Sequence, residues 1–453
     1  MHAANPHNDN VSNLHSDLLS HIHPDVTIFW YRRDLRVSDN AGLYYALREN
    51  EKVLPVFILD TTILNDLEEK ADPRVEFILE SLNILNDEFV KFGSSLLVLH
   101  GDPVDLFRSI SPKAVYTNHD YEPYARERDE KVGEILNAKG IPFRTFKDQV
   151  IFDKDEVVKS DGTPYTVFTP YSRQWKNTLT KFYLRPYPAD KYLSSLLNVD
   201  PFRIPAIEAI GFRSSGIELP PRVIKRKLIS NYNKTRDIPA IDGTSRLGVH
   251  LRFGTISIRA LAGFALKNNE TFLKELIWRE FYSMILYHFP QVVTSSFKPA
   301  YDRIPWRNDE REFHLWCGGN TGYPLVDAGM RELNKTGFMH NRVRMVAASF
   351  LTKHLLIDWR WGEAYFAKKL LDYDLASNNG GWQWAAGSGC DAAPYFRIFN
   401  PALQSRRFDP SNAYVKKWVP EFGTEKYARP IVEHTSARER ALRTYQKALE
   451  RSG

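Results

Sequence analysis

Short apolar segments alternate with helical segments in the first third of this 453-residue chain, and this alternation limits the fold more than any other feature. Buried strands are predicted at 26–31, 53–59, 94–100, 114–119 and 141–146, and helical periodicity at 40–49, 74–92 and 123–138. Such alternation predicts an α/β domain with a doubly wound parallel sheet, whose ligands bind where the strands end. Residues 32–40, RRDLRVSDN, are expected there. No GxGxxG follows the first strand, so a nicotinamide-type dinucleotide fingerprint is absent.

The pattern changes after residue 150. Residues 151–212 carry many Pro, Tyr and Ser with little periodicity, which indicates a long interdomain linker. The remainder, 213–453, is predicted to be an all-α domain, with periodicity clear from about Val223 and helix ends at Gly337 and Gly362. Residues 1–24 are polar and lack the apolar core of a signal peptide, so we expect a flexible tail before an α/β domain at 25–150.

Composition narrows the class of protein. Hydrophobic residues make up 43% and charged residues 26%, which is typical of a globular protein. No window holds 18 apolar residues, so no membrane span is expected. The two cysteines, Cys317 and Cys390, do not make a metal cluster and favour a reduced, cytoplasmic protein that binds no metal. A net charge of +6 permits nucleic-acid binding, but a slightly basic soluble enzyme has the same balance.

Residues 275–282, ELIWREFY, place ionisable and aromatic side chains on one helical face. The spacing i, i+3, i+4 and i+7 aligns Glu275, Trp278, Arg279 and Tyr282. Charges on a buried stripe need partners or a polar ligand. The alternative is an amphipathic helix whose Glu275–Arg279 pair is solvated.

Residues 243–254, GTSRLGVHLRFG, combine glycine, hydroxyls and a guanidinium before a helix, which suits a phosphate. An ordinary N-cap at Thr244 or Ser245 would give the same pattern.

Residues 339–345, MHNRVRM, place Asn341, Arg344 and Met345 on one helical face. Arg342 projects elsewhere and is a candidate for a phosphate of a polyanion. The alternative is the start of an ordinary surface helix.

The segment 372–401 gathers small and flat residues. Asp372 and Asp374 can accept hydrogen bonds, Asn378 can donate and accept, and Gly380–Gly381 let a flat ring approach the backbone. On a helix Trp382 and Trp384 would differ by about 200° in direction, so that one faces the core and the other lines a cavity. Two core tryptophans are the alternative.

Taken together, these segments resemble the photolyase/cryptochrome family, most closely the class I cyclobutane pyrimidine dimer photolyases, from FWYRRDLRVSDN to WVPE near residue 418. The resemblance implies an antenna chromophore in the α/β domain and FAD, reduced when active, in the helical domain. It also implies a lyase activity, the light-driven reversal of pyrimidine dimers in single- or double-stranded DNA, by a monomer.

The resemblance also implies roles for residues around the flavin. Asp372, Asp374 and Asn378 would hold the ring, with Asn378 near its N5 atom and Arg344 paired with Asp372. Trp382, Trp359 and Trp306 would form an electron-transfer chain. Further FAD contacts are implied for Tyr232, Thr244, Ser245, Arg246, Leu247, Gly248, Phe272, Arg279, Phe338 and Asn341.

The substrate contacts follow from the same resemblance. Glu275 would hydrogen-bond a thymine carbonyl and stabilise the dimer after it receives an electron. A carboxylate would repel that charge, so we expect burial to raise the pKa of Glu275, opposed by Arg279 or Arg344. Contacts with the dimer or the DNA are implied for Arg236, Trp278, Arg279, Tyr282, Asn341, Arg342, Met345, Trp384 and Arg397.

Some positions depart from the family pattern. Phe272 and Phe338 stand where Trp is common and preserve aromatic character, so FAD binding is still expected. Gly248 replaces a common Ser, which removes one hydrogen bond worth about 1 kcal/mol. Residues 122–129 and Val293–Thr294 do not match a folate site, which favours a deazaflavin or flavin antenna over folate.

Two other functions use the same fold. A cryptochrome would sense blue light through partners, but often carries a long carboxyl-terminal extension and, in plants, Asp in place of Asn378. Repair of the (6-4) photoproduct uses a pocket His, whereas Asn341 and Met345 stand here and His340 precedes that face. The complete set around Glu275 favours dimer repair.

Overall fold

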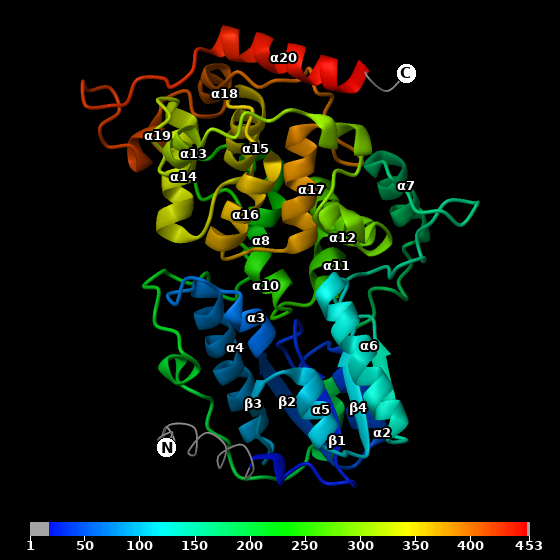
Figure 1. Cartoon of the computed structure of the whole chain (residues 1–453). Coiled ribbons are helices and arrows are strands. Elements are labelled where there is room, and N and C mark those ends of the chain that lie inside the picture. Colours follow the sequence, from blue (N-terminus) through cyan, green and yellow to red (C-terminus); the bar gives the residue numbers. More distant parts are fainter. Residues whose placement is uncertain (1–17, 451–453) are drawn as a thin grey trace, which may run out of the picture. The chain divides into compact units, whose positions relative to one another are not determined.

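The computed structural model describes residues 18–450, which divide into two compact units (Figure 1). The first unit holds the chain up to Ile151 together with Thr180–Arg222 and His250–Leu261. The second holds Phe152–Leu179, Val223–Val249 and the chain from Ala262 onward. The expected linker, 151–212, is therefore shared between the two units, and the expected helical domain, 213–453, contributes 213–222 and His250–Leu261 to the first.

The predicted tail, 1–24, falls mostly on residues 1–17, which lie outside the described residues. From residue 18 onward the chain packs: Ile22 is buried in the core beside the sheet, and Leu18 and Leu19 are partly buried against it. These three apolar side chains share one side of a short turn, so the packed part of the chain begins before residue 25.

Five parallel strands form the sheet of the first unit, in the order β3-β2-β1-β4-β5, which confirms the predicted fold class. The strands are β1 Thr27–Tyr31, β2 Val53–Asp60, β3 Leu97–Gly101, β4 Ala114–Asn118 and β5 Phe143–Phe146. Every residue of β1, β2 and β4 is buried, as expected of strands covered on both faces.

Helices connect these strands. They are α2 Ala41–Glu49, α3 Thr61–Asn65, α4 Pro73–Val90, α5 Pro103–Ser109 and α6 Pro123–Ala138, whereas η1 Ala189–Ser195 and η2 Ile207–Ile210 follow the last strand in the chain. Side chains of Asn40, Asp72 and Asp102 accept backbone N–H groups at the starts of α2, α4 and α5, and proline opens α4, α5 and α6. The chain thus encodes most of these helix starts locally.

The segment 32–40 does follow the carboxyl end of β1, but its arginines are paired. Arg36 lies 2.6 Å from Asp148, Arg33 lies 3.0 Å from Asp120, and Arg32 contacts Asp129. These ion pairs tie the loops of the first unit together.

The second unit is helical, as predicted. Its helices are α7 Phe168–Thr178, α8 Arg226–Ser230, α9 Tyr232–Thr235, α12 Glu270–His288, η3 Pro290–Val293, η4 Pro299–Arg303, α13 Glu310–Cys317, α14 Pro324–Thr336, α15 Asn341–Ser349, η5 Phe350–His354, α16 Trp359–Lys369, α17 Leu375–Ala386, α18 Pro401–Phe408, α19 Ala413–Trp418 and α20 His434–Glu450. The unit boundaries fall inside α10 Gly248–Arg252 and α11 Ile258–Asn268. The main core lies among α13 to α17 and α19.

Helix α7 was not predicted. Phe168, Tyr171, Ser172 and Trp175 are buried at i, i+3, i+4 and i+7, and the Trp175 indole donates to Glu280 of α12 at 2.5 Å. The abundant Pro, Tyr and Ser around this stretch masked an apolar helical face of ordinary spacing.

The two glycines predicted to end helices differ. Gly337 does end α14, in a left-handed conformation with φ of 66°. Gly362 lies inside α16, because a Cβ atom there would stand 2.1 Å from the Trp382 ring of α17. Its role is close helix packing, and the prediction of a helix end was wrong.

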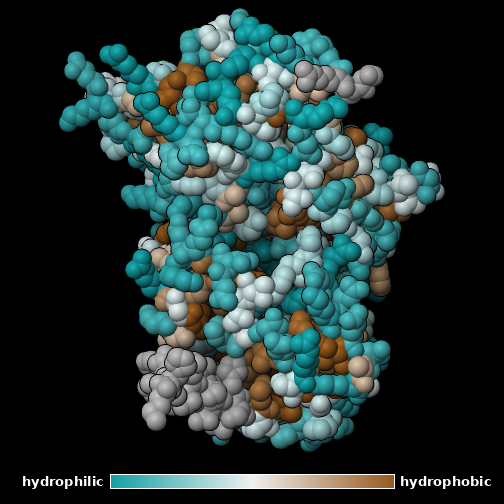
Figure 2. Space-filling model, in the orientation of Figure 1, coloured by the Kyte–Doolittle hydropathy of each residue, from teal (hydrophilic) through white to brown (hydrophobic). Residues whose placement is uncertain are grey.

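On the face shown in Figure 2 the surface is mostly hydrophilic, with smaller hydrophobic areas. Within residues 18–450, no helix combines the length and the apolar character needed to cross a membrane.

Candidate functional site

A cavity of about 410 Å³ opens in the second unit, within the size range of sites for small molecules and cofactors. It is lined by Arg236, Glu275, Trp278, Arg279, Tyr282, Asn341, Arg344, Met345, Ala348, Phe366, Leu370, Asp372, Asp374, Ser377, Asn378, Gly381, Trp382 and Trp384. Most residues singled out in the sequence for flavin or dimer contacts are therefore neighbours in space.

Helix α12 contributes one face to this cavity. Glu275, Trp278, Arg279 and Tyr282 all line it, as the i, i+3, i+4 and i+7 spacing predicts. The Trp278 ring stacks on Phe168 of α7, with centroids 3.6 Å apart and planes 6° apart. The unpredicted α7 thus fixes one aromatic wall of the cavity.

The start of α17 presents carboxylates and amides. Asp374 caps the helix by accepting the Ser377 N–H at 3.0 Å. Asp372 pairs with Arg344 at 3.0 Å, as expected, and Arg344 also donates to the Met339 carbonyl. Both carboxylates are therefore held in place before any ligand arrives.

Asn378 is held by Glu363 of α16, a residue that the sequence did not single out. Its Nδ2 donates to the Glu363 carbonyl at 3.1 Å and to the Glu363 carboxylate at 2.8 Å. Burial raises the pKa of Glu363, and the bond from Asn378 opposes that shift. No sequence spacing links these two residues, because they come from different helices.

Glu275 is paired with Arg236, which follows α9. Burial raises the pKa of Glu275, Arg236 opposes this shift and Asp237 reinforces it. The direction agrees with the prediction, but the opposing cation is Arg236 rather than Arg279 or Arg344. Arg236 was expected to face DNA, and its proximity to Glu275 depends on tertiary folding.

Eight other residues predicted to contact FAD are absent from the lining of this cavity, as far as residues 18–450 show. They are Tyr232, Thr244, Ser245, Arg246, Leu247, Gly248, Phe272 and Phe338. Several pack beside it: Tyr232 meets Phe272 edge to face at 5.1 Å, and the Arg246 guanidinium lies 4.6 Å from the Phe338 ring.

The structure explains the glycine at position 248. A Cβ atom there would lie 2.8 Å from an Asp372 carboxylate oxygen and 2.9 Å from its Cβ. The serine that the family resemblance led us to expect here does not fit this backbone unless Asp372 shifts. Gly248 also brings the 244–248 loop against a residue that lines the cavity.

The arginines expected to contact DNA have different surroundings. Arg342 pairs with Asp237 at 2.7 Å and lies 4.2 Å from the Phe408 ring. Arg397 is exposed. Among residues 18–450, the hydrogen bond found for it joins its backbone N–H to the Pro394 carbonyl. Neither lines the cavity, whereas Arg236 does, and the DNA contacts of all three stay a prediction.

The three predicted electron-transfer tryptophans belong to the same core. Trp359 and Trp382 are buried, and Trp306 packs partly against this core and against Tyr445. The ring centroid of Trp382 also lies 5.0 Å from that of Phe366 and 6.0 Å from that of Trp316, a fully buried indole that sequence reasoning did not select. Both indoles of α17 line the cavity, but Trp382 is buried in the core whereas Trp384 is only partly buried.

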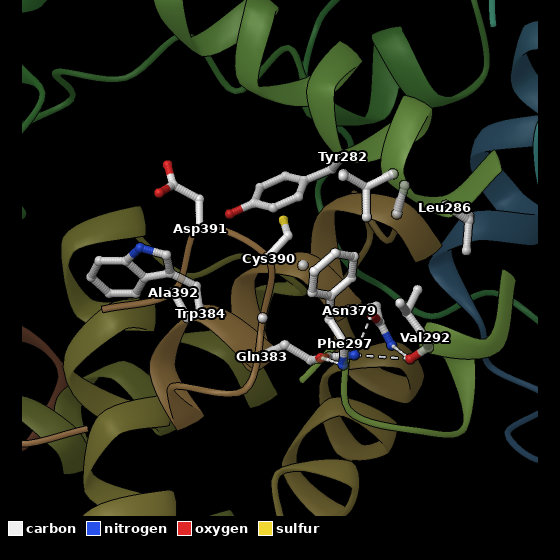
Figure 3. Close-up of a pocket in the computed structure, with 14 residues that line it drawn as sticks. Tyr282, Leu286, Val292, Phe297, Asn379, Gln383, Trp384, Cys390, Asp391 and Ala392 are labelled. Carbon is white, nitrogen blue, oxygen red and sulfur yellow. Dashed lines mark hydrogen bonds between the residues drawn. The ribbon is translucent and has the colours of Figure 1, made fainter. Parts of the chain in front are cut away.

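A second, smaller cavity shares Tyr282 and Trp384 with the first (Figure 3). Beside it, the Gln383 amide donates to the Val292 and Ser295 carbonyls and to Asn379, and it accepts the Phe297 N–H at 2.8 Å. Asn379 also donates to Val292. This bonded network, which sequence reasoning missed, fixes the helix that carries Trp384.

Within the described part of the chain, no group of three or more His, Cys, Asp or Glu residues has an arrangement able to hold a metal ion.

Comparison with known proteins agrees with this geometry. Residues 27–191 match the family described as DNA photolyase, and residues 272–425 match the FAD binding domain of DNA photolyase. A deoxyribodipyrimidine photo-lyase from Halobacterium salinarum is 37% identical, over 93% of this chain and 99% of the relative.

Solved structures agree as well. A bacterial class III photolyase from Agrobacterium tumefaciens aligns with a TM-score of 0.82 and 32% identity, over 95% of this chain and 98% of the other. An archaeal photolyase from Sulfolobus tokodaii with two FAD molecules aligns with a TM-score of 0.77 and 34% identity, over 93% of this chain and the whole of the other. In sequence and in fold, this chain belongs to the DNA photolyase family.

Proposed function

We propose that this chain repairs cyclobutane pyrimidine dimers in DNA with light, using FAD bound in the 410 Å³ cavity. The observation that carries the proposal is that one cavity joins the α12 face around Glu275 to the α17 residues around Asn378. The match to an FAD binding domain over 272–425 covers both helices. The relatives named as deoxyribodipyrimidine photo-lyases support the same reaction.

The residues present fit FAD. Asp372, Asp374 and Asn378 offer hydrogen-bonding groups to a flat polar ring, and the pair with Arg344 fixes the position of the Asp372 side chain beside it. The Asn378 amide nitrogen is already committed to Glu363, so its oxygen is the group left to accept a bond from a ring N–H. When bound, FAD supplies the electron-transfer chemistry, and the protein supplies position and electrostatics.

The other wall suits an extruded pair of bases. Trp278 and Trp384 provide aromatic faces, each worth roughly 1–3 kcal/mol per stacked base. Extrusion from a duplex costs a few kcal/mol and least for a damaged base, so the pocket favours a dimer over intact pyrimidines. Asn341 and Met345 close this wall from α15.

Glu275 is the chain's acid for the substrate. A protonated Glu275 would donate to a thymine carbonyl and lower the energy of the negative charge that reaches the dimer. Its raised pKa, caused by burial, favours that proton. Arg236, Arg342 and Arg397 would contact phosphates, which gives affinity without sequence preference for single- or double-stranded DNA.

Trp382, Trp359 and Trp306 would carry an electron through the core toward the flavin when it is oxidised. They lie in one aromatic cluster, with Trp382 on the cavity and Trp306 half-buried. For the first unit we propose a deazaflavin or flavin antenna. The archaeal neighbour with two FAD molecules, whose second FAD is described as implying a novel light-harvesting cofactor, supports this choice.

The test is repair of a dimer-containing oligonucleotide by protein with reduced flavin, in blue light and in the dark. We expect intact pyrimidines to appear only in the light. Glu275→Ala should lose most of the yield, whereas Lys274→Gln, an exposed neighbour on α12 outside the cavity, should repair like the wild type. Light-independent product, or none at full FAD occupancy, would refute the proposal.

A further inference from the structure

Arg236 and Glu275 form an ion pair at the cavity. The guanidinium donates directly to the Glu275 carboxylate, and the two side chains keep 24% and 29% of their surface exposed. Both line the cavity, so an arriving ligand can reach each of them. The pair therefore joins a residue suited to a phosphate with the acid proposed for the dimer.

A second ion pair lies beside the first. Arg342 contacts Asp237, the residue next to Arg236, at 2.7 Å, and Asp237 is 44% exposed. The two arginines and two carboxylates are balanced in the absence of DNA. If both arginines turned to phosphates, Glu275 and Asp237 would be left as two unpaired carboxylates, close enough for the charge of Asp237 to act on Glu275.

The surroundings of Glu275 indicate which of the two carboxylates gains a proton when the arginines turn to phosphates. Burial raises the pKa of Glu275, Arg236 is the cation that opposes this, and Asp237 raises the pKa further. Other titratable or charged side chains on elements around it are Tyr232, Arg279, Tyr282, Arg344 and Asp372, the last two paired with each other. Glu275 is the less exposed of the two carboxylates, at 29% against 44% for Asp237, so it is the group that would gain a proton when its cation leaves.

We propose that a DNA phosphate takes Arg236 away from Glu275 and that Glu275 then binds one proton from solvent, so that DNA binding itself generates the acid that meets the dimer. This inference rests on the proposed function. The phosphodiester stays anionic throughout, and the only covalent change is the O–H bond formed on the Glu275 carboxylate. Arg236 is thus a positioning residue that acts through Glu275.

The sign of the pH effect follows from linkage. The pKa of Glu275 is lower in the free protein, where Arg236 pairs with it, and higher in the complex. Between these two values binding takes up a proton, and affinity falls tenfold for each unit rise in pH. Below the lower value and above the higher one, no proton is exchanged by this group.

The experiment is calorimetric titration, in the dark, of a dimer-containing oligonucleotide into FAD-loaded protein, in two buffers with different ionisation enthalpies. The difference in apparent enthalpy gives the protons taken up. We expect uptake that rises toward one proton per complex within a pH window in the wild type. Arg236→Gln and Glu275→Gln should lose it, because the first leaves Glu275 without its cation beforehand and the second cannot titrate.

Two variants serve as controls. Arg236→Lys keeps the charge and should keep the uptake, which separates the ion pair from a general loss of structure. Arg397→Gln removes a proposed phosphate contact that has no carboxylate partner among the described residues, and it should weaken binding without changing the uptake.

The outcomes of the titration distinguish failure of this inference from failure of the proposed function. Tight dimer binding with no proton uptake by the wild type would overturn the inference and leave the repair function intact. Uptake that persists in Arg236→Gln, or disappears in Arg397→Gln, would also overturn it. No preference for dimer-containing over undamaged oligonucleotide would instead refute the proposed function.

Discussion

Replacement of Gly362 by alanine tests the packing that holds Trp382. A Cβ atom at position 362 would lie 2.1 and 2.4 Å from ring atoms of Trp382 and 2.6 Å from Leu351. None of these neighbours can retreat easily, because Trp382 and Leu351 are both buried in the same core. We therefore expect Gly362→Ala to push α16 from α17 or to tilt the Trp382 indole.

The expected change in the free energy of unfolding is the difference between the cost of overpacking the core and the gain in helix propensity. Overpacking a dense core costs about 1–3 kcal/mol, while alanine in place of glycine favours a helix by about 1 kcal/mol. Gly362→Ala should thus lower the free energy of unfolding by roughly 0–2 kcal/mol. Gly133→Ala inside α6 is the matched control, because its new Cβ would meet Phe143 at an ordinary 3.4 Å. It should gain about 1 kcal/mol, which leaves the two variants about 1–3 kcal/mol apart.

Two assays read this change. Denaturant unfolding of each unit gives the free energies, and illumination of the oxidised protein with a thiol reductant gives the rate of flavin photoreduction. We expect Gly362→Ala to lose stability relative to Gly133→Ala and to photoreduce more slowly than the wild type. If Gly362→Ala were stabilised as much as Gly133→Ala and photoreduced normally, the close approach of α16 and α17 would have no consequence and the reasoning would fail.

Three further predictions concern the site. Trp382→Phe should abolish photoreduction of oxidised FAD but spare repair by chemically reduced protein, and equal loss in both assays would show a structural role. Glu275→Gln should retain much more repair quantum yield than Glu275→Ala, since a donor in a dry pocket contributes about 2.7–4 kcal/mol, and an alanine variant equal to the wild type would remove any electrostatic role. Arg342→Ala should lower the slope of log K against log salt by roughly 0.7–0.9, and an unchanged slope would place this residue outside the DNA interface.

The sheet could be predicted because the residues that define each strand and each helix start are close together in the sequence. Strands β1 to β4 are short, mostly apolar runs, and the helix starts at Asn40, Asp72 and Asp102 are encoded by capping side chains. The prediction of a buried strand at 141–146 was wrong in its burial, because β5, FRTF, alternates apolar and polar residues and none of them is buried. Helix α7 escaped because proline, tyrosine and serine dominate its surroundings, although Tyr171 and Trp175 repeat at helical spacing. The boundaries of the two units could not be predicted from the sequence, because they depend on which segments pack together in the fold.

The candidate site was predictable only within single helices. The α12 face around Glu275 follows from spacing, whereas Asp372, just before α17, and Asn378, within it, were singled out by their hydrogen-bonding groups and given a flavin role by resemblance. The partners of these residues come from elsewhere: Arg236 for Glu275, and Glu363 for Asn378. No period or motif connects a residue to a partner on another helix, so hydrogen bonds and pKa causes needed the fold.

The bond between Asn378 and Glu363 restricts which side chain position 378 can carry. An aspartate there would set a second carboxyl group about 2.8 Å from the Glu363 oxygen that now accepts the amide. Two carboxylates so close cannot both be ionised, and the pair would retain a shared proton. Asn378→Asp would therefore replace a fixed amide dipole next to the flavin position by a carboxyl group that shares one titratable proton with Glu363. The amide itself does not titrate, so the side chain at position 378 adds no charge that varies with pH beside the flavin position.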